Sequence, residues 1–325
     1  MQRASDIAVP EREPESAPAA RRNLPDRIWA VALTALGAAV LIVAAVIVVE
    51  LLRIGGPTLS QTGLVAFVKN SVWDVTRDVF GALPFIYGTL VTSGVALVLA
   101  LPVSVGLALF LTEMAPPRVR SIVSFPISLL AGIPSVVYGL WGLFVLVPLL
   151  RRPVEPFLAR THLPLFTGAP IGLGYLAAGI VLAIMILPTI TSIAIEVLRT
   201  VPGSLREAAL ALGATRWEAI RAAVIPYART GIIGATILGL GRALGETMAV
   251  TMVIGNSPTI RASLFAPGYT LPAVIANEFA EASGDLHTGA LAALGLLLFA
   301  VTVVLNIAAR LLVRMVRRGP VRVAA

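Results

Sequence analysis

The sequence contains no cysteine among its 325 residues, only two histidines, and a single lysine, Lys69. Without cysteine the chain forms neither a disulfide framework nor a thiolate metal site. His162 and His287 lie far apart in the sequence, which argues against a metal site built from histidines. Because Val68 precedes Lys69, the sequence also lacks the Gly-Lys-Ser/Thr phosphate loop. We therefore predict no metal and no cofactor, and any ATP that the protein uses must bind to another chain.

Charged residues are scarce as well. They make up 13% of the chain, whereas 58% is hydrophobic, which is the composition of a membrane protein. Long apolar runs predict six membrane-spanning helices, over residues 30–49, 85–112, 121–150, 171–195, 230–260 and 288–309. No nucleophile stands beside a base, and no carboxylate pair occupies a polar setting, so we predict no enzymatic activity. The predicted fold class is an all-α integral membrane protein.

The basic residues predict how these spans are oriented. The net charge of +8 and the pI near 10.9 are compatible with nucleic-acid binding, but the arginines cluster beside the apolar runs. Seventeen of the 25 Lys and Arg residues fall on one side of the predicted bilayer and seven on the other. By the positive-inside rule both termini are cytoplasmic, and no nucleic-acid partner is predicted. The predicted domains are a disordered tail (1–28), a six-span membrane domain (29–315) and a basic tail (316–325).

Residues 202–226 are too polar to span a bilayer and predict a cytoplasmic elbow. Ser204 with Glu207, and Thr215 with Glu218, have the spacing of capping boxes, and Gly213 between them favours a helix end. Helical spacing also predicts one shallow apolar face, formed by Leu205, Ala208, Ala209 and Leu212. Two interpretations remain open here, an ordinary elbow lying in the membrane interface or a helix that docks into a partner's groove.

Arg242 and Glu246 are the only charges inside the predicted spans. Four residues apart on a helix, they would share a face and pair. Charges within a bilayer are costly and are functional by default, so an anion site on a pathway is the first interpretation. A structural ion pair that fixes helix packing is the second. Pro134 and Pro188 also lie within spans, where they either kink the helices for packing or act as flex points.

Several segments carry a resemblance to a known family. Glu207-Ala208-Ala209 followed by Gly213 and Ile225-Pro226 resembles the EAA motif of ABC importer permeases. Residues 239–256 (GLGRALGETMAVTMVIGN) are similar to the PstC permeases of high-affinity phosphate importers. So are residues 80–93 (FGALPFIYGTLVTS), 132–144 (GIPSVVYGLWGLF) and 276–282 (ANEFAEA). The resemblance covers about residues 64–310.

The resemblance implies a type I (MetI-like) permease of the bacterial cell membrane that carries phosphate. Its expected partners are a PstA-like permease, a PstB-like ATPase dimer and a PstS-like phosphate-binding protein. It implies a coupling helix that contacts the ATPase through Glu207, Ala208, Ala209, Leu212 and Gly213. It also implies a phosphate pathway that includes Arg242, Glu246, Thr247 and Ser135. Two other functions remain open, a permease for sulfate or molybdate and a membrane sensor or scaffold that does not transport.

Overall fold

The structure, a computed structural model, describes residues 24–318, which are helical throughout apart from connecting loops and one isolated antiparallel bridge between Asp74 and Val79. Most of the two predicted tails lies outside these residues. Helix α1 (Leu24–Thr62) begins within the segment predicted as the N-terminal tail. The chain divides into two units, residues 1–50 and residues 51–325.

In the first unit, the described part of α1 is a single apolar helix. Its large side chains, such as Leu36, Val40 and Leu41, are more than half exposed. A helix satisfies its own backbone hydrogen bonds, so an apolar helix of this kind is suited to lipid rather than to water.

The second unit supplies the remaining spans. By length and composition, six spans are found among the described residues, as predicted. After α1 they are α3 (Leu83–Leu109) with the π-helical segment η1 (Phe110–Met114); the continuous run of α5 (Ser135–Trp141), η2 (Gly142–Leu146), α6 (Val147–Leu149), η3 (Leu150–Val154) and α7 (Glu155–Ala159); α8 (Tyr175–Arg199); α10 (Arg216–Ala219) with η5 (Ile220–Val224) and α11 (Ile225–Leu244); and α14 (Asp285–Arg318).

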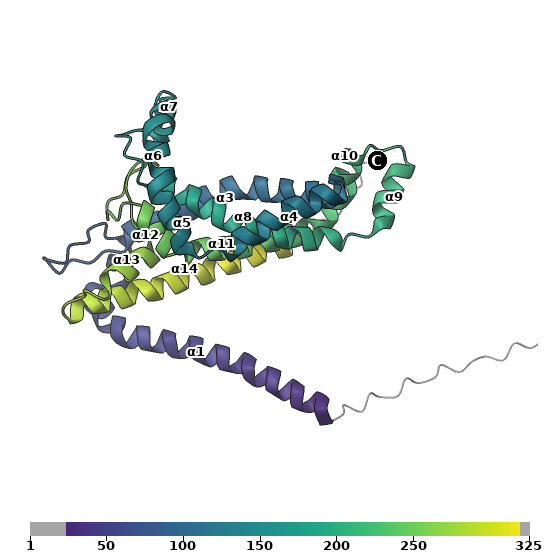
Figure 1. Ribbon diagram of the computed structural model, residues 1–325. Helices are drawn as coiled ribbons and strands as arrows, with labels where there is room; N and C mark the ends of the chain where they lie inside the picture. The colour runs from purple at the N-terminus through teal and green to yellow at the C-terminus, as the bar shows by residue number, and fades with distance from the viewer. Residues whose placement is uncertain (1–23, 319–325) are drawn as a thin grey trace, which may run out of the picture. The chain divides into compact units, whose positions relative to one another are not determined.

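Shorter helices connect or brace these spans. They are α2 (Leu64–Lys69), α4 (Pro117–Gly132), the 3-10 turn η4 (Pro164–Phe166), α9 (Gly203–Ala211), α12 (Met248–Val253) and α13 (Leu271–Glu278). Within the second unit, α9 and α10 lie at one end of the helix bundle and α13 lies at the other (Figure 1).

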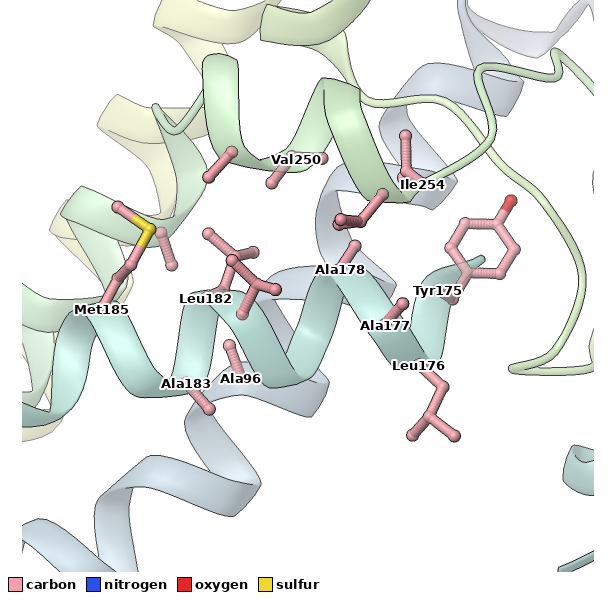
Figure 2. Close-up of a cluster of buried hydrophobic side chains, with 14 of the residues drawn as sticks. Ala96, Tyr175, Leu176, Ala177, Ala178, Leu182, Ala183, Met185, Val250 and Ile254 are labelled. Carbon is pink, nitrogen blue, oxygen red and sulfur yellow. The ribbon is translucent and has the colours of Figure 1, made fainter. Parts of the chain in front are cut away.

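Helix α8 is the centre of the core. It is the most buried of the spans and packs along α3 and against α11. In Figure 2, residues of α8 from Tyr175 to Met185 lie beside Val250 of α12 and Ile254, which directly follows α12, with Ala96 of α3 in the same cluster. Helix α8 also contacts α11, which carries Arg242, and α5, which begins at Ser135.

Two predicted spans have different boundaries in the structure. Residues 121–150 were predicted as one helix, but the chain breaks at Ile133 and Pro134, both in extended conformation, between α4 and α5. Proline disfavours helical geometry at the residue before it and has no N–H to donate. The predicted span over residues 230–260 likewise ends at Leu244, and α12 begins only at Met248. The third span therefore starts at Ser135, and the fifth starts earlier, at Arg216.

The first half of α13 is buried in the core. Leu271, Ala273 and Val274 have no exposed area, because α13 packs against α14 and α3. At its C-terminal end, Glu278 accepts a hydrogen bond from Trp73 Nε1 at 2.9 Å and lies 3.3 Å from His287 Nε2.

Candidate functional site

Two of the local features predicted for the elbow, the helix end at Gly213 and the second capping box, are present in the structure. Gly213 has φ of 82°, and the N–H groups of Gly213 and Ala214 donate to the carbonyls of Leu210 and Ala209, at 3.0 and 3.2 Å. These bonds form a Schellman motif, in which glycine at the left-handed position ends α9. The second predicted capping box is present, since Thr215 and Glu218 bond reciprocally at the start of α10.

The first predicted capping box is not formed. Helix α9 begins at Gly203 with Pro202 at its N-cap, and no side chain caps it. Ser204 therefore lies inside the first turn, two residues after the N-cap position. Pro202, whose φ of −58° and extended ψ lead into the helix, sets the helix start in its place.

The predicted coupling residues lie on an open surface. No residue of α9 is buried; Glu207, Ala208 and Gly213 are exposed, Ala209 is half-buried, and Leu212 is 90% exposed. An exposed leucine beside two small residues gives a shallow apolar surface. Such a surface fits a groove on a partner, as helix-in-groove recognition requires.

One ion pair at this elbow, between Arg206 and Glu113, was not predicted from the sequence. Arg206 of α9 donates two hydrogen bonds to the carboxylate of Glu113 in η1, at 2.8 and 2.6 Å. These residues are 93 positions apart. Glu113 ends a predicted span and Arg206 sits in the elbow, so only the packing of α3 beside α8 reveals that they meet.

The predicted phosphate pathway lies where α11 breaks. Arg242 stands in the last turn of α11 with an exposed side chain, and its Nη1 donates to Thr189 Oγ1 of α8 at 3.4 Å. Glu246 follows the break, and its carboxylate accepts the N–H of Ala249 at 3.2 Å. Thr247 is the N-cap residue of α12. At the break, the Arg242 guanidinium therefore bonds to Thr189, whereas the Glu246 carboxylate bonds to the N–H of Ala249.

The predicted pairing of Arg242 with Glu246 is wrong. No ion pair between them occurs in the described part of the chain. The i, i+4 geometry requires a continuous helix, and α11 ends at Leu244, two residues before Glu246. A structural ion pair between these two residues therefore does not explain why either charge is in the span.

Ser135 lies at the second break, as the first residue of α5. Helix α5 packs on α12, so the two broken segments are neighbours. Their approach is close at Gly139, where an added Cβ would lie 3.0 Å from Ala249 Cα. Tyr138, in the next turn of α5, is within electrostatic range of Arg242. The helices that flank the two breaks, α5, α11 and α12, thus all contact α8.

This arrangement offers donors to an anion. A guanidinium presents a planar fork of N–H groups that matches tetrahedral oxyanions, and broken helices supply polar groups at membrane depth. Irregular backbone is tolerated there only where protein or a water-filled cavity covers it. On this chain alone the side chain of Arg242 is exposed.

Comparisons with known proteins show the family of this chain. Residues 82–318 match the family described as binding-protein-dependent transport system inner membrane component. The phosphate transport system permease protein PstC of Mesorhizobium japonicum is 46% identical over 93% of this chain and 94% of its own length. PstC of Haemophilus influenzae is 47% identical over 76% of this chain and 80% of its own length.

Solved structures share the fold. A chain of a bacterial alginate ABC transporter, in complex with an alginate pentasaccharide-bound periplasmic protein, has a TM-score of 0.59 at 18% identity. The match covers 92% of this chain and 99% of that one. A chain of the inward-facing MetNI methionine ABC transporter has a TM-score of 0.55 at 18% identity, covering 74% and 95%. The chain therefore belongs to the binding-protein-dependent transport system inner membrane component family, and within it to the PstC permeases.

Proposed function

We propose that this protein is the permease subunit of an ATP-driven importer of inorganic phosphate and forms one half of the translocation pathway. The observation that carries the proposal is the identity of 46% to a phosphate transport permease over 93% of the chain. The exposed guanidinium at the break of α11 is consistent with it. The protein is a multi-pass membrane component of a transporter and not an enzyme.

As an ABC importer permease it works with an ATPase and a binding protein. We assign the finer identities from the resemblance: a PstA-like permease, two PstB-like ATPases and a PstS-like phosphate-binding protein. The exposed Arg242 supports a second permease that completes the pathway. The open surface of α9 supports ATPase docking through Glu207, Ala208, Ala209, Leu212 and Gly213. From the distribution of basic residues and the positive-inside rule, we assign both termini and α9 to the cytoplasm.

In this pathway Arg242 is the phosphate contact. Phosphate that leaves water must exchange its hydration for protein donors, and a guanidinium supplies two parallel charge-assisted bonds. Among the described residues, Arg242 makes one hydrogen bond, a long one to Thr189, so most of the guanidinium donors are available to the anion. Glu246 holds the start of α12 in place, and Thr247 and Ser135 bring hydroxyl groups to the two breaks.

Phosphate uptake in vesicles that contain all four components tests this function. We expect ATP-dependent accumulation of radiolabelled phosphate that excess sulfate does not inhibit. Strong competition by sulfate or molybdate would instead assign another oxyanion. ATP turnover without accumulation of any of these anions would favour a sensor that does not transport.

A further inference from the structure

The inner end of α3 is tied to the coupling elbow by a pair of charged residues. Glu113 has a nearly buried side chain, 8% exposed, and both of its oxygens accept from Arg206, whose side chain is 27% exposed. Two parallel bonds between a guanidinium and a carboxylate fix direction as well as distance. The pair therefore resists pivoting between α9 and α3 more than a single bond would.

Arg206 reaches a third helix at the same time. Its Nη1 donates to the carbonyl of Val201 at 2.7 Å and its Nη2 to that of Leu198 at 3.3 Å. Leu198 lies in the last turn of α8, where helix carbonyls have no partner within the helix and a positive charge is favourable. The hydrogen bonds that Arg206 donates to Glu113 raise the pKa of Arg206, so the guanidinium stays charged at every physiological pH.

The same end of α3 is bonded to α4 from the other side. Arg120 of α4 donates through Nε to the carbonyl of Leu111 at 2.7 Å and through Nη2 to that of Thr112 at 3.2 Å. Both carbonyls belong to η1, a π-helical segment of the kind frequently found at functional sites. Helix α4 leads directly into the break at Pro134, next to Ser135.

A connected route thus runs from the elbow to the pathway. It passes from α9 through Arg206 and Glu113 to η1, and from η1 through Arg120 to α4. Because no residue of α9 is buried, apolar packing alone holds α9 only weakly against the spans. Polar bonds must then fix the direction in which a push on α9 moves α3 and α4.

We propose that Glu113 and Arg206 form a positioning joint that transmits ATPase-driven movement of α9 to α3 and, through Arg120, to α4. The proposal rests on the proposed function, since it assumes that α9 receives movement from an ATPase. Without the joint, α9 stays covalently attached and can still dock. Helix α9 can then pivot, however. ATP turnover continues, but each cycle transmits less movement from α9 to the helices of the pathway.

The test compares Glu113→Gln with Glu196→Gln in the complete complex. Glu196 makes a bond of 2.9 Å to Arg199 near the same end of α8, but both side chains are more than half exposed, so it is a matched control for loss of charge. For Glu113→Gln we expect phosphate moved per ATP to fall about tenfold, within the ~5–150-fold range of coupling between sites. Glu196→Gln should keep the wild-type ratio.

Two further measurements separate a joint from a purely structural contact. Because the chain has no cysteine, Glu113→Cys with Arg206→Cys can be joined by a bifunctional thiol reagent after assembly. Joining should restore the ratio that the unjoined double variant loses, whereas a folding defect would not be restored. A single reporter, Val137→Cys in α5, should change its thiol-labelling rate with ATP, and Glu113→Gln should abolish that change.

The reporter also separates failure of the joint from failure of the proposed function. A reporter that responds to ATP in the wild type, without phosphate uptake, would refute phosphate transport and leave the joint standing. A wild-type ratio and a wild-type reporter response in assembled Glu113→Gln would overturn the joint. So would a loss of assembly with an unchanged ratio, or a double variant that joining does not restore.

Discussion

Thr189 accepts a hydrogen bond from the side chain of Arg242. The bond between Thr189 Oγ1 and Arg242 Nη1 is long, 3.4 Å, and it crosses from α8 to the end of α11. A long bond orients a side chain without saturating it. Thr189 therefore determines where the guanidinium points, whereas the charge and the fork of Arg242 bind the anion.

Thr189→Val tests this division of roles. The substitution removes the hydroxyl and keeps the side-chain shape, so a bond worth about 0.5–1.5 kcal/mol is lost. We expect the KM for phosphate uptake to rise about twofold to tenfold while the amount of assembled complex stays constant. Thr200→Val is the matched control, because Thr200 is exposed and bonds only locally, to the carbonyl of Val197. An unchanged KM in Thr189→Val would show that this bond does not orient Arg242.

Single residues were predictable from sequence where their chemistry is local. Gly213 and the Thr215–Glu218 box follow from rules that involve residues at most five positions apart, and the structure has both. Arg206 with Glu113 was not predictable, because a contact across 93 positions depends on how α3 and α8 pack. The Arg242–Glu246 pair failed for a related reason, since it assumed a helix that the break at Gly245 interrupts.

At the scale of elements, the elbow depends on how α9 ends. Gly213 has φ of 82°, and an added Cβ there would meet nothing within 4 Å, so only backbone strain limits the residue at this position. The left-handed conformation costs an L-residue about 1–2 kcal/mol, and a β-branched residue tolerates it least. Asparagine adopts it more readily, because its short polar side chain bonds locally.

Gly213→Val should therefore misdirect α9, and Gly213→Asn should not. We expect Gly213→Val to reduce copurification of the ATPase and phosphate-stimulated ATP turnover by severalfold, with normal membrane insertion. Gly213→Asn, which differs chiefly in its tolerance of positive φ, serves as the control. If both variants retain wild-type copurification and turnover, the coupling role of Glu207–Gly213 is wrong.

The number of spans was predictable, but the exact places of the two helix breaks were not. Hydrophobic runs record only that a segment is largely apolar, and the runs predicted as spans continue across both breaks. Pro134 was a visible signal, since proline excludes helical geometry at Ile133. The break after Leu244 has a weaker signal, one glycine followed by two polar residues.

At the scale of the whole molecule, the account requires one orientation in the membrane. Ser283 precedes α14 and Thr200 follows α8, and both are exposed in the structure. In the proposed topology Ser283 faces the outside and Thr200 faces the cytoplasm. Single cysteines at these positions are unambiguous reporters, because the chain has no cysteine of its own.

We expect an impermeant thiol reagent to label Ser283→Cys in cells stripped of outer barriers. It should leave Thr200→Cys unlabelled until the membrane is permeabilised. Labelling of both positions after permeabilisation is the control for exposure. The reverse pattern in intact cells would invert the topology and place α9 on the side away from any cytoplasmic ATPase.

The central claim is that phosphate crosses the membrane by way of Arg242 in the assembled transporter. Initial rates of phosphate uptake by complexes that carry Arg242→Gln, Arg242→Lys or the control Arg199→Gln test it most directly. Arg199 is a matched control because it forms an exposed pair with Glu196. Loss of charge-assisted bonds worth about 1.5–3 kcal/mol predicts a fall of roughly tenfold or more for Arg242→Gln. Arg242→Lys should retain part of the rate, because it keeps the charge but lacks the fork. Uptake at the wild-type rate by fully assembled Arg242→Gln would contradict the account.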